Sequence, residues 1–139
     1  MHKIKENLKR FYNKNAEQFH NTRKKLWPEF NYILAEINKS ENNNIKILEL
    51  WCGDWRLLKF LQENSNKNIN YKWIDLSNKL IDIAKVDNPG WNFVVNDMIN
   101  QCEIETQEEY DFVISVASFQ HLPNSYQRIL LLKHIYKCL

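Results

Sequence analysis

The chain has 139 residues, of which 44% are hydrophobic and 13% aromatic, and its formal net charge is +2. This length and composition predict a single folded domain and exclude a disordered chain. A net charge this small does not by itself indicate a nucleic-acid partner. No apolar run approaches the roughly 20 residues that span a membrane, and the polar N-terminus lacks the apolar core of a signal peptide. The three cysteines show no CxxC spacing, so we expect no disulfide framework and no metal site, which fits a cytoplasmic location.

Apolar residues change their spacing at about residue 40. Before this point, helical spacing predicts helices over 3–20 and 28–37, which would form an N-terminal helical cap over residues 1–40. Basic residues concentrate here, in HKIKENLKR and TRKK, either as a solvated helix face or as a phosphate-facing surface. Over residues 41–139, the expected elements are a strand at 45–50, a helix at 56–62, a strand at 71–75, a helix to 85 after the N-cap Ser77, a strand at 92–95, a loop, a strand at 110–116 and a helix at 125–138. This alternation predicts an α/β fold, a Rossmann-like, doubly wound parallel sheet with helices on both faces.

Acidic residues lie at the ends of three successive predicted strands. Glu49 is late in the first strand, Asp75 ends the second, and Asp97 follows the third. Ligands of such folds bind beyond the carboxyl ends of the strands. A carboxylate at Asp75 can accept from both hydroxyls of a ribose, and one at Asp97 can accept from the exocyclic amine of an adenine, with Met98 against the ring. A single aspartate after a strand is usually a turn or cap residue, but three such acids favour a shared site.

Four segments in order resemble the motifs of class I S-adenosylmethionine-dependent methyltransferases, of the type 11 kind. They are IKILELWCGDWRLLKFL, YKWIDLSNKLIDIAK, FVVNDM and YDFVISVASFQHLPN, and the first matches a strand followed by acid-x-G-x-G-x-G. The resemblance runs from about residue 45 to the end of the chain. It implies S-adenosylmethionine as cofactor, methyl transfer as activity and an incomplete domain with strands one to four of seven, truncated at its C-terminal side. A dinucleotide-dependent oxidoreductase, with G-x-G-x-x-G, fits less well because its third glycine would be Arg56.

The resemblance also assigns roles to single residues. Glu49 stands for the acid that approaches the methionine amino group, and Val116 and Ala117 would line the floor beneath the sulfonium. His121 would face the acceptor pocket as a catalytic candidate, although a lone histidine is more often a structural hydrogen-bonding residue. The cofactor-binding set implied is Glu49, Trp51, Gly53, Trp55, Asp75, Leu76, Asp97, Met98 and Val116.

The stretch FYNKNAEQFHNTRKKLWPEF is similar to the lead-in of the tRNA wobble-uridine carboxymethyl methyltransferases. That family has a tyrosine, a threonine–arginine pair and a tryptophan–proline pair before its first strand. The resemblance implies that Tyr12 and Arg23 form a lid over the cofactor. It favours tRNA as the methyl acceptor, with small molecules and proteins as open alternatives.

Tryptophan stands where that first motif has glycine. The chain has five tryptophans and only two glycines, and Trp51 and Trp55 occupy two of the three glycine positions. Glycine at such turns often holds a positive φ and lets the backbone approach the ligand. We therefore expect an indole at 51 or 55 to enter the cofactor's space or to push the following helix off its strand. Three hypotheses follow. The chain is a degenerate, cofactor-free scaffold, or unusual packing keeps the site. In the third, the natural protein has glycine at these positions, and its UGA glycine codons have been translated as tryptophan in the written sequence.

Overall fold

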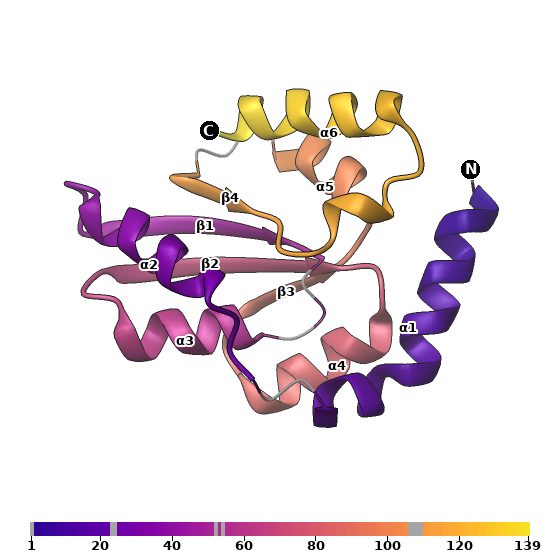
Figure 1. Ribbon diagram of the computed structural model, residues 1–139, viewed down its shortest axis with the longest axis horizontal. Coiled ribbons are helices and arrows are strands. Elements are labelled where there is room, and N and C mark those ends of the chain that lie inside the picture. Colours follow the sequence, from indigo (N-terminus) through magenta and orange to yellow (C-terminus); the bar gives the residue numbers. More distant parts are fainter. Residues whose placement is uncertain (1, 23–24, 52, 54, 106–109) are drawn as a thin grey trace.

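The computed structural model describes residues 2–22, 25–51, 53, 55–105 and 110–139 (Figure 1). Its helices are α1 (His2–Thr22), α2 (Glu29–Lys39), α3 (Arg56–Asn64), α4 (Asn78–Asp87), α5 (Met98–Ile104) and α6 (Ser125–Cys138), with a 3-10 turn, η2 (Phe119–His121). Its strands are β1 (Asn44–Leu50), β2 (Asn68–Asp75), β3 (Asn92–Val95) and β4 (Phe112–Ile114).

The four strands form one parallel sheet in the order β3-β2-β1-β4. This order begins the doubly wound arrangement, in which the chain changes direction between β1 and β4 and ligands bind outside the strand ends at that point. Figure 1 shows α3 and α4 on one face of the sheet and α5 and α6 on the other. The predicted Rossmann-like α/β fold is therefore confirmed.

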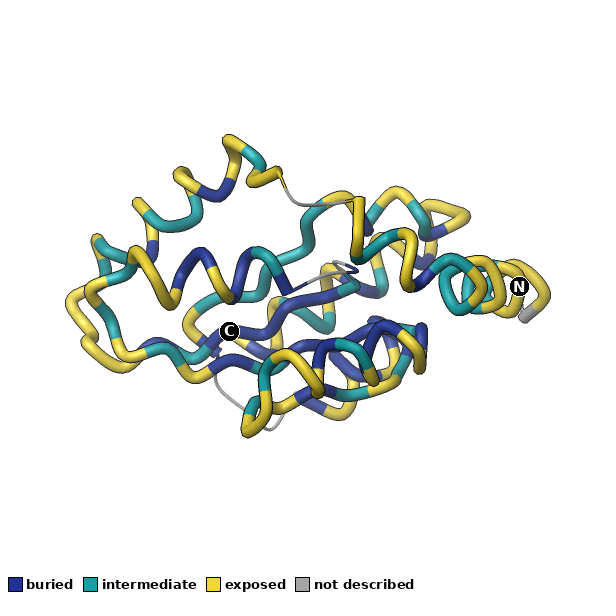
Figure 2. The backbone as a smooth tube through the Cα atoms, turned by 90° about the horizontal axis from the view of Figure 1, so that it is seen from below, coloured by how far each residue is buried: buried dark blue, intermediate teal, exposed yellow. Residues whose placement is uncertain are grey.

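Each face of the sheet carries its own hydrophobic cluster. Ile47 of β1 belongs to the cluster shared with α3 and α4, whereas Leu48 belongs to the one shared with α5 and α6. Because helices cover both faces, residues 47–50 of β1 and 73–75 of β2 are buried, and buried backbone runs through the middle of the molecule in Figure 2. Trp73 of β2 is fully buried and packs edge-to-face on Phe93 at 5.3 Å between ring centroids, so a tryptophan fits this core position.

Helix α1 lies across the carboxyl ends of the strands instead of on a face of the sheet (Figure 1). It packs against α4, and its buried Ala16 belongs to the core. The Asn13 side chain accepts hydrogen bonds from the Ser77 hydroxyl at 2.6 Å and the Lys79 amide at 3.3 Å. Whereas α2 packs on α3, α1 covers the edge where the predicted site residues end (Figure 1).

Three expected elements differ from the structure, and one of them is β2, which begins at Asn68 instead of residue 71. Residues 98–104, expected as a loop, form α5, because the Asp97 carboxylate caps the helix by accepting from the Ile99 and Asn100 amides. The fourth strand is limited to Phe112–Ile114, shorter than the predicted 110–116. The N-cap at Ser77 is confirmed, since its hydroxyl accepts from the Leu80 amide at 3.2 Å. Across the described ranges, no helix is long and apolar enough to cross a membrane.

Candidate cofactor site

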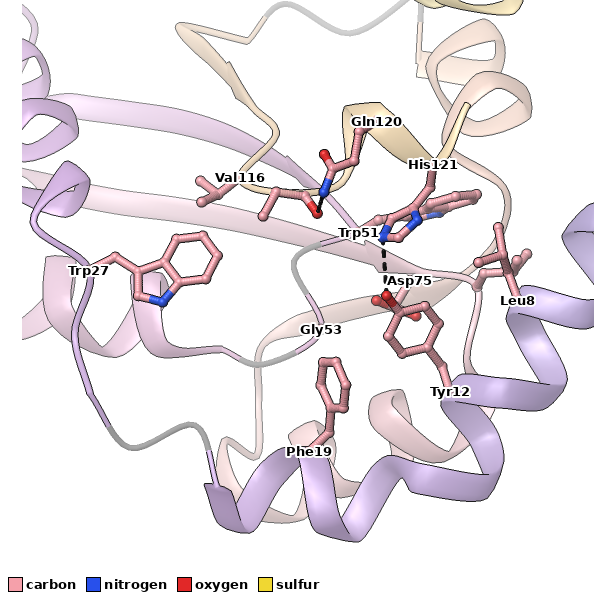
Figure 3. A pocket seen from close by; sticks show the side chains of 12 residues that line it. Leu8, Tyr12, Phe19, Trp27, Trp51, Gly53, Asp75, Val116, Gln120 and His121 are labelled. Atoms are coloured by element: carbon pink, nitrogen blue, oxygen red, sulfur yellow. Dashed lines mark hydrogen bonds between the residues drawn. The ribbon is translucent and has the colours of Figure 1, made fainter. Parts of the chain in front are cut away.

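A cavity of about 270 Å³ lies beneath α1 at the carboxyl ends of β1 and β2 (Figure 3). It collects residues from five separate parts of the chain: α1, the segment just before α2, the turn after β1, the end of β2 and the segment after β4. Of the predicted site residues, it brings together Tyr12, Trp51, Gly53, Asp75, Leu76, Val116, Ala117 and His121. The cavity also has walls that the sequence analysis did not assign to it, namely Leu8, Phe19, Trp27 and Gln120. Leu8, Tyr12 and Phe19 repeat at helical spacing, which could have indicated a common face.

Gly53 supplies the open backbone in the turn after β1. Its φ is +72°, a conformation that side chains rarely adopt, and a Cβ there would lie 3.7 Å from the Phe19 ring. The one motif position that keeps a glycine therefore lies where the backbone faces the cavity.

Asp75 is the buried carboxyl group of the cavity. It is 6% exposed, and its Oδ1 accepts from the Ser77 amide at 2.7 Å. Burial raises the pKa of this carboxyl to about 7, although hydrogen bonds from the backbone of Ser77, Gly53 and Leu76 act in the opposite direction. Burial disfavours the charged form of this carboxyl group. A ligand that donates hydrogen bonds to the carboxylate would stabilise that charged form, so the cavity favours such a ligand.

Tyr12 and His121 join the two sides of the cavity. The Tyr12 hydroxyl and His121 Nε2 lie 3.1 Å apart, and their rings meet edge-to-face (Figure 3). This contact connects α1 with η2, although the two residues are 109 positions apart in sequence. Ala117, just before η2, has a positive φ of 53°, so the segment after β4 turns sharply at the cavity wall.

Trp51 lies within the cavity wall in a backbone conformation typical of glycine. Its φ is +51°. Its amide donates to the carbonyl of Ile74 at 2.8 Å, and its indole Nε1 donates to the carbonyl of Asn96 at 3.3 Å. The indole therefore reaches from the end of β1 to the turn after β3.

Trp55, in contrast, does not line the cavity. It is 8% exposed and stacks on His20 of α1, with 4.7 Å between ring centroids. Its φ of −72° is ordinary for any residue, and α3 begins at the next position. The expectation that position 55 contributes to the cofactor site or displaces the helix is not met, because α1 offers this indole a packing partner outside the cavity.

Three more predicted residues lie outside the cavity. Glu49 is fully buried in β1 and accepts from the Tyr71 hydroxyl at 2.5 Å, while Met98 is a core residue of α5. Asp97 lines a second hollow of about 420 Å³ and forms an ion pair with Lys5 of α1 at 3.0 Å. The other predicted lid residue, Arg23, lies outside the described residues. In the ranges that the structure covers, no three metal-ligating side chains gather.

The strand order and the position of the cavity define an α/β domain with a ligand site at the switch point of its sheet. Residues 47–139 match the family model described as a methyltransferase domain. The chain therefore belongs to the methyltransferase domain family, as its four motifs predicted.

Two curated relatives act on tRNA according to their names. The chain is 29% identical over 133 residues to the tRNA (carboxymethyluridine(34)-5-O)-methyltransferase of Saccharomyces cerevisiae, which covers 96% of this chain. It is 28% identical over 144 residues to the tRNA N(3)-methylcytidine methyltransferase of Schizosaccharomyces pombe, which covers 93% of it. The chain spans 44% of the length of each of these relatives.

Solved structures support the same fold. A sugar N-methyltransferase from Streptoalloteichus sp. superposes with a TM-score of 0.69 at 15% identity, over 88% of this chain and 48% of that one. A TehB-like SAM-dependent methyltransferase from Corynebacterium glutamicum superposes with a TM-score of 0.68 at 23% identity, over 94% of this chain and 66% of that one. At these identities, the likeness establishes the fold.

Proposed function

We propose that the cavity beneath α1 is the cofactor site of an S-adenosylmethionine-dependent methyltransferase domain. The observation that carries the proposal is the meeting of Gly53, Asp75, Val116 and His121 around one cavity at the strand ends. These residues come from the first, second and fourth motifs of a chain that belongs to the methyltransferase domain family.

The residues on the Asp75 side of the cavity fit the ribose and methionine parts of this cofactor. The Asp75 carboxylate would accept from the two ribose hydroxyls, because its two oxygens match a vicinal diol. Gly53 leaves the backbone open to close approach, and Val116 and Ala117 form apolar wall beside it. The cofactor, when bound, supplies an already activated methyl group. The protein's task is then to align the groups that react and to exclude water.

The Asp97 side fits the adenine less well. The Asp97 carboxylate is already used by the α5 cap and by Lys5, and the Trp51 indole extends toward Asn96 beside it. A bound adenine would have to take the place of the Lys5 contact. Glu49, beneath the strand end, would act on the site through hydrogen bonds instead of touching a ligand from within the cavity.

For the methyl acceptor we propose tRNA. The support comes from the names of the two curated relatives and from the basic residues of the first 25 positions. His121, held by the Tyr12 hydroxyl at the cavity wall, is the group that would receive a proton if the acceptor has to lose one.

A cofactor-free scaffold is the second candidate, and Trp51 is the observation that favours it. Its indole lies in the cavity wall, and its positive φ is what a glycine would adopt at this position. The same φ agrees with the hypothesis that the codon at 51 is a UGA read as glycine. A UGA codon at 51 together with a UGG codon at 27 would support that hypothesis, whereas UGG at both positions would contradict it.

Calorimetric titration of S-adenosylhomocysteine tests the proposed function. We expect saturable binding that weakens at least tenfold in Asp75→Asn, because the amide cannot accept both ribose hydroxyls. The matched control is Asp82→Asn, an exposed aspartate of α4, which should leave the dissociation constant unchanged. Binding that is indifferent to Asp75 would contradict the proposal. The absence of binding in both the natural chain and a Trp51→Gly variant would favour the scaffold.

A further inference from the structure

The Trp51 side chain crosses the edge of the sheet from one strand to another. Its amide is fixed to the end of β2 through the Ile74 carbonyl, while its indole is fixed to the turn after β3 through the Asn96 carbonyl. Because the strand order is β3-β2-β1, this path leads past the end of β2, where Asp75 lies. Asn96 itself donates its amide to the Asp75 carbonyl at 3.0 Å, so the indole is attached directly beside the predicted ribose ligand.

Two separate hollows lie on the two sides of this crossing. The cavity of about 270 Å³ contains Asp75 and has Trp51 in its wall, whereas the hollow of about 420 Å³ contains Asn96 and Asp97. Leu76 is the residue that lines both. A nucleoside with its ribose on Asp75 and its base at Asp97 would have to occupy both hollows at once, and the indole, in the wall of the first, reaches Asn96 in the wall of the second.

We propose that Trp51 weakens the binding of the adenosyl cofactor to this site: its indole lies in the wall of the Asp75 cavity, reaches Asn96 in the wall of the Asp97 hollow, and obstructs a ligand that extends between them. This inference rests on the proposed function, since it concerns the same site. It adds that the chain binds the extended adenosyl ligand tightly only when the indole is displaced or removed.

The backbone at Trp51 makes removal of the indole a practical test. A φ of +51° is favourable for glycine and unfavourable for tryptophan, so Trp51→Gly keeps the turn that the chain already has. The substitution removes the hydrogen bond from the indole to the Asn96 carbonyl, and it keeps the hydrogen bond from the backbone amide of residue 51 to the Ile74 carbonyl. The hollows would then join, while Asp75 and Asp97 remain in place.

The experiment compares dissociation constants for S-adenosylhomocysteine among four proteins by calorimetric titration. We expect Trp51→Gly to bind at least tenfold more tightly than the natural chain, and Trp51→Phe, with a smaller ring and no N–H donor, to lie between them. The matched control is Trp91→Gly, the same change at a half-buried tryptophan that lines neither hollow, which should bind as the natural chain does. Thermal melting by circular dichroism establishes that each variant is folded. If Trp51→Gly does not fold, Trp51→Phe carries the test, and its affinity must still exceed that of the natural chain.

Each outcome decides the inference. Equal affinity in the natural chain and Trp51→Gly would overturn it, and the proposed function would stand if that binding requires Asp75. Tighter binding in Trp91→Gly as well would overturn it, because the gain would then come from general loosening. No binding in any of the proteins would overturn both the inference and the proposed function.

Discussion

The buried carboxyl group of Asp75 makes the stability of this protein depend on pH in a way that one substitution can reveal. Its pKa rises from an ordinary 3.8 to about 7 because burial disfavours the charged form. Between these values, the folded protein holds a proton that the unfolded chain has lost. On this account, the free energy of unfolding is greatest in acid. It falls as the pH rises from about 3.8 to about 7 and levels off above that.

The size of the effect follows from the shift. Three units at 1.36 kcal/mol each give about 4 kcal/mol in total, of which about 3 kcal/mol is lost between pH 5 and pH 8. Asp75→Asn removes the titrating group, while the amide oxygen can still accept from the Ser77 amide. We expect the variant to gain stability relative to the natural chain by about 3 kcal/mol across this range.

Urea denaturation at several pH values, followed by circular dichroism, measures this difference. Other titrating groups are present in both proteins, so subtraction isolates Asp75. Asp82→Asn, at an exposed position, serves as the matched control. A difference between the natural chain and Asp75→Asn that stays within about 0.5 kcal/mol from pH 5 to pH 8 would show that the carboxyl is not buried in its neutral form.

Three further substitutions test contacts of α1 and an ion pair away from the site. Trp55→Ala should lower the free energy of unfolding by about 3 kcal/mol, since it empties a buried position beneath α1; a loss below about 1 kcal/mol in urea denaturation would contradict this packing. Tyr12→Phe removes the hydroxyl that contacts His121, and hydrogen exchange in α1 should become about fivefold faster, for a bond worth about 1 kcal/mol; unchanged protection would argue against the contact. Burial disfavours the charged form of Glu105, but hydrogen bonds, first among them one from Lys72, outweigh burial and lower the pKa of this carboxyl group. The stability that the charged Glu105 contributes is therefore lost as pH falls. Glu105→Gln should therefore cost about 2 kcal/mol near pH 7 and less in acid, and an equal cost at both would refute this account.

Local patterns were sufficient to predict the sheet and most of its helices. The alternation of apolar runs predicted all four strands, and Ser77 was recognised as an N-cap from its residue type and position. Helix α5 was missed because the ligand role was preferred for Asp97 over the cap role that a single aspartate after a strand usually has. The same carboxylate caps that helix, and seven residues are too few for a clear helical period.

Within the site, residues at strand ends were predictable and residues fixed by distant contacts were not. Asp75 and Gly53 line the cavity because the strand and the turn alone determine where they point. Trp55 was misplaced because its partner, His20, lies 35 positions earlier in a helix whose docking no local pattern reveals. The link between Tyr12 and His121 likewise depends on how α1 crosses the strand ends.

Helix α1 is attached at several points along the edge that carries the site. Lys5 contacts Asp97, Asn13 contacts Ser77, and the Phe19 ring lies against Gly53 in addition to the contact of Tyr12 with His121. Because these attachments lie on both sides of the cavity, a ligand too large for its opening would enter only when the helix lifts away. The rate of association would then level off at high ligand concentration, and the plateau would report how often α1 opens and not how strongly the ligand is held.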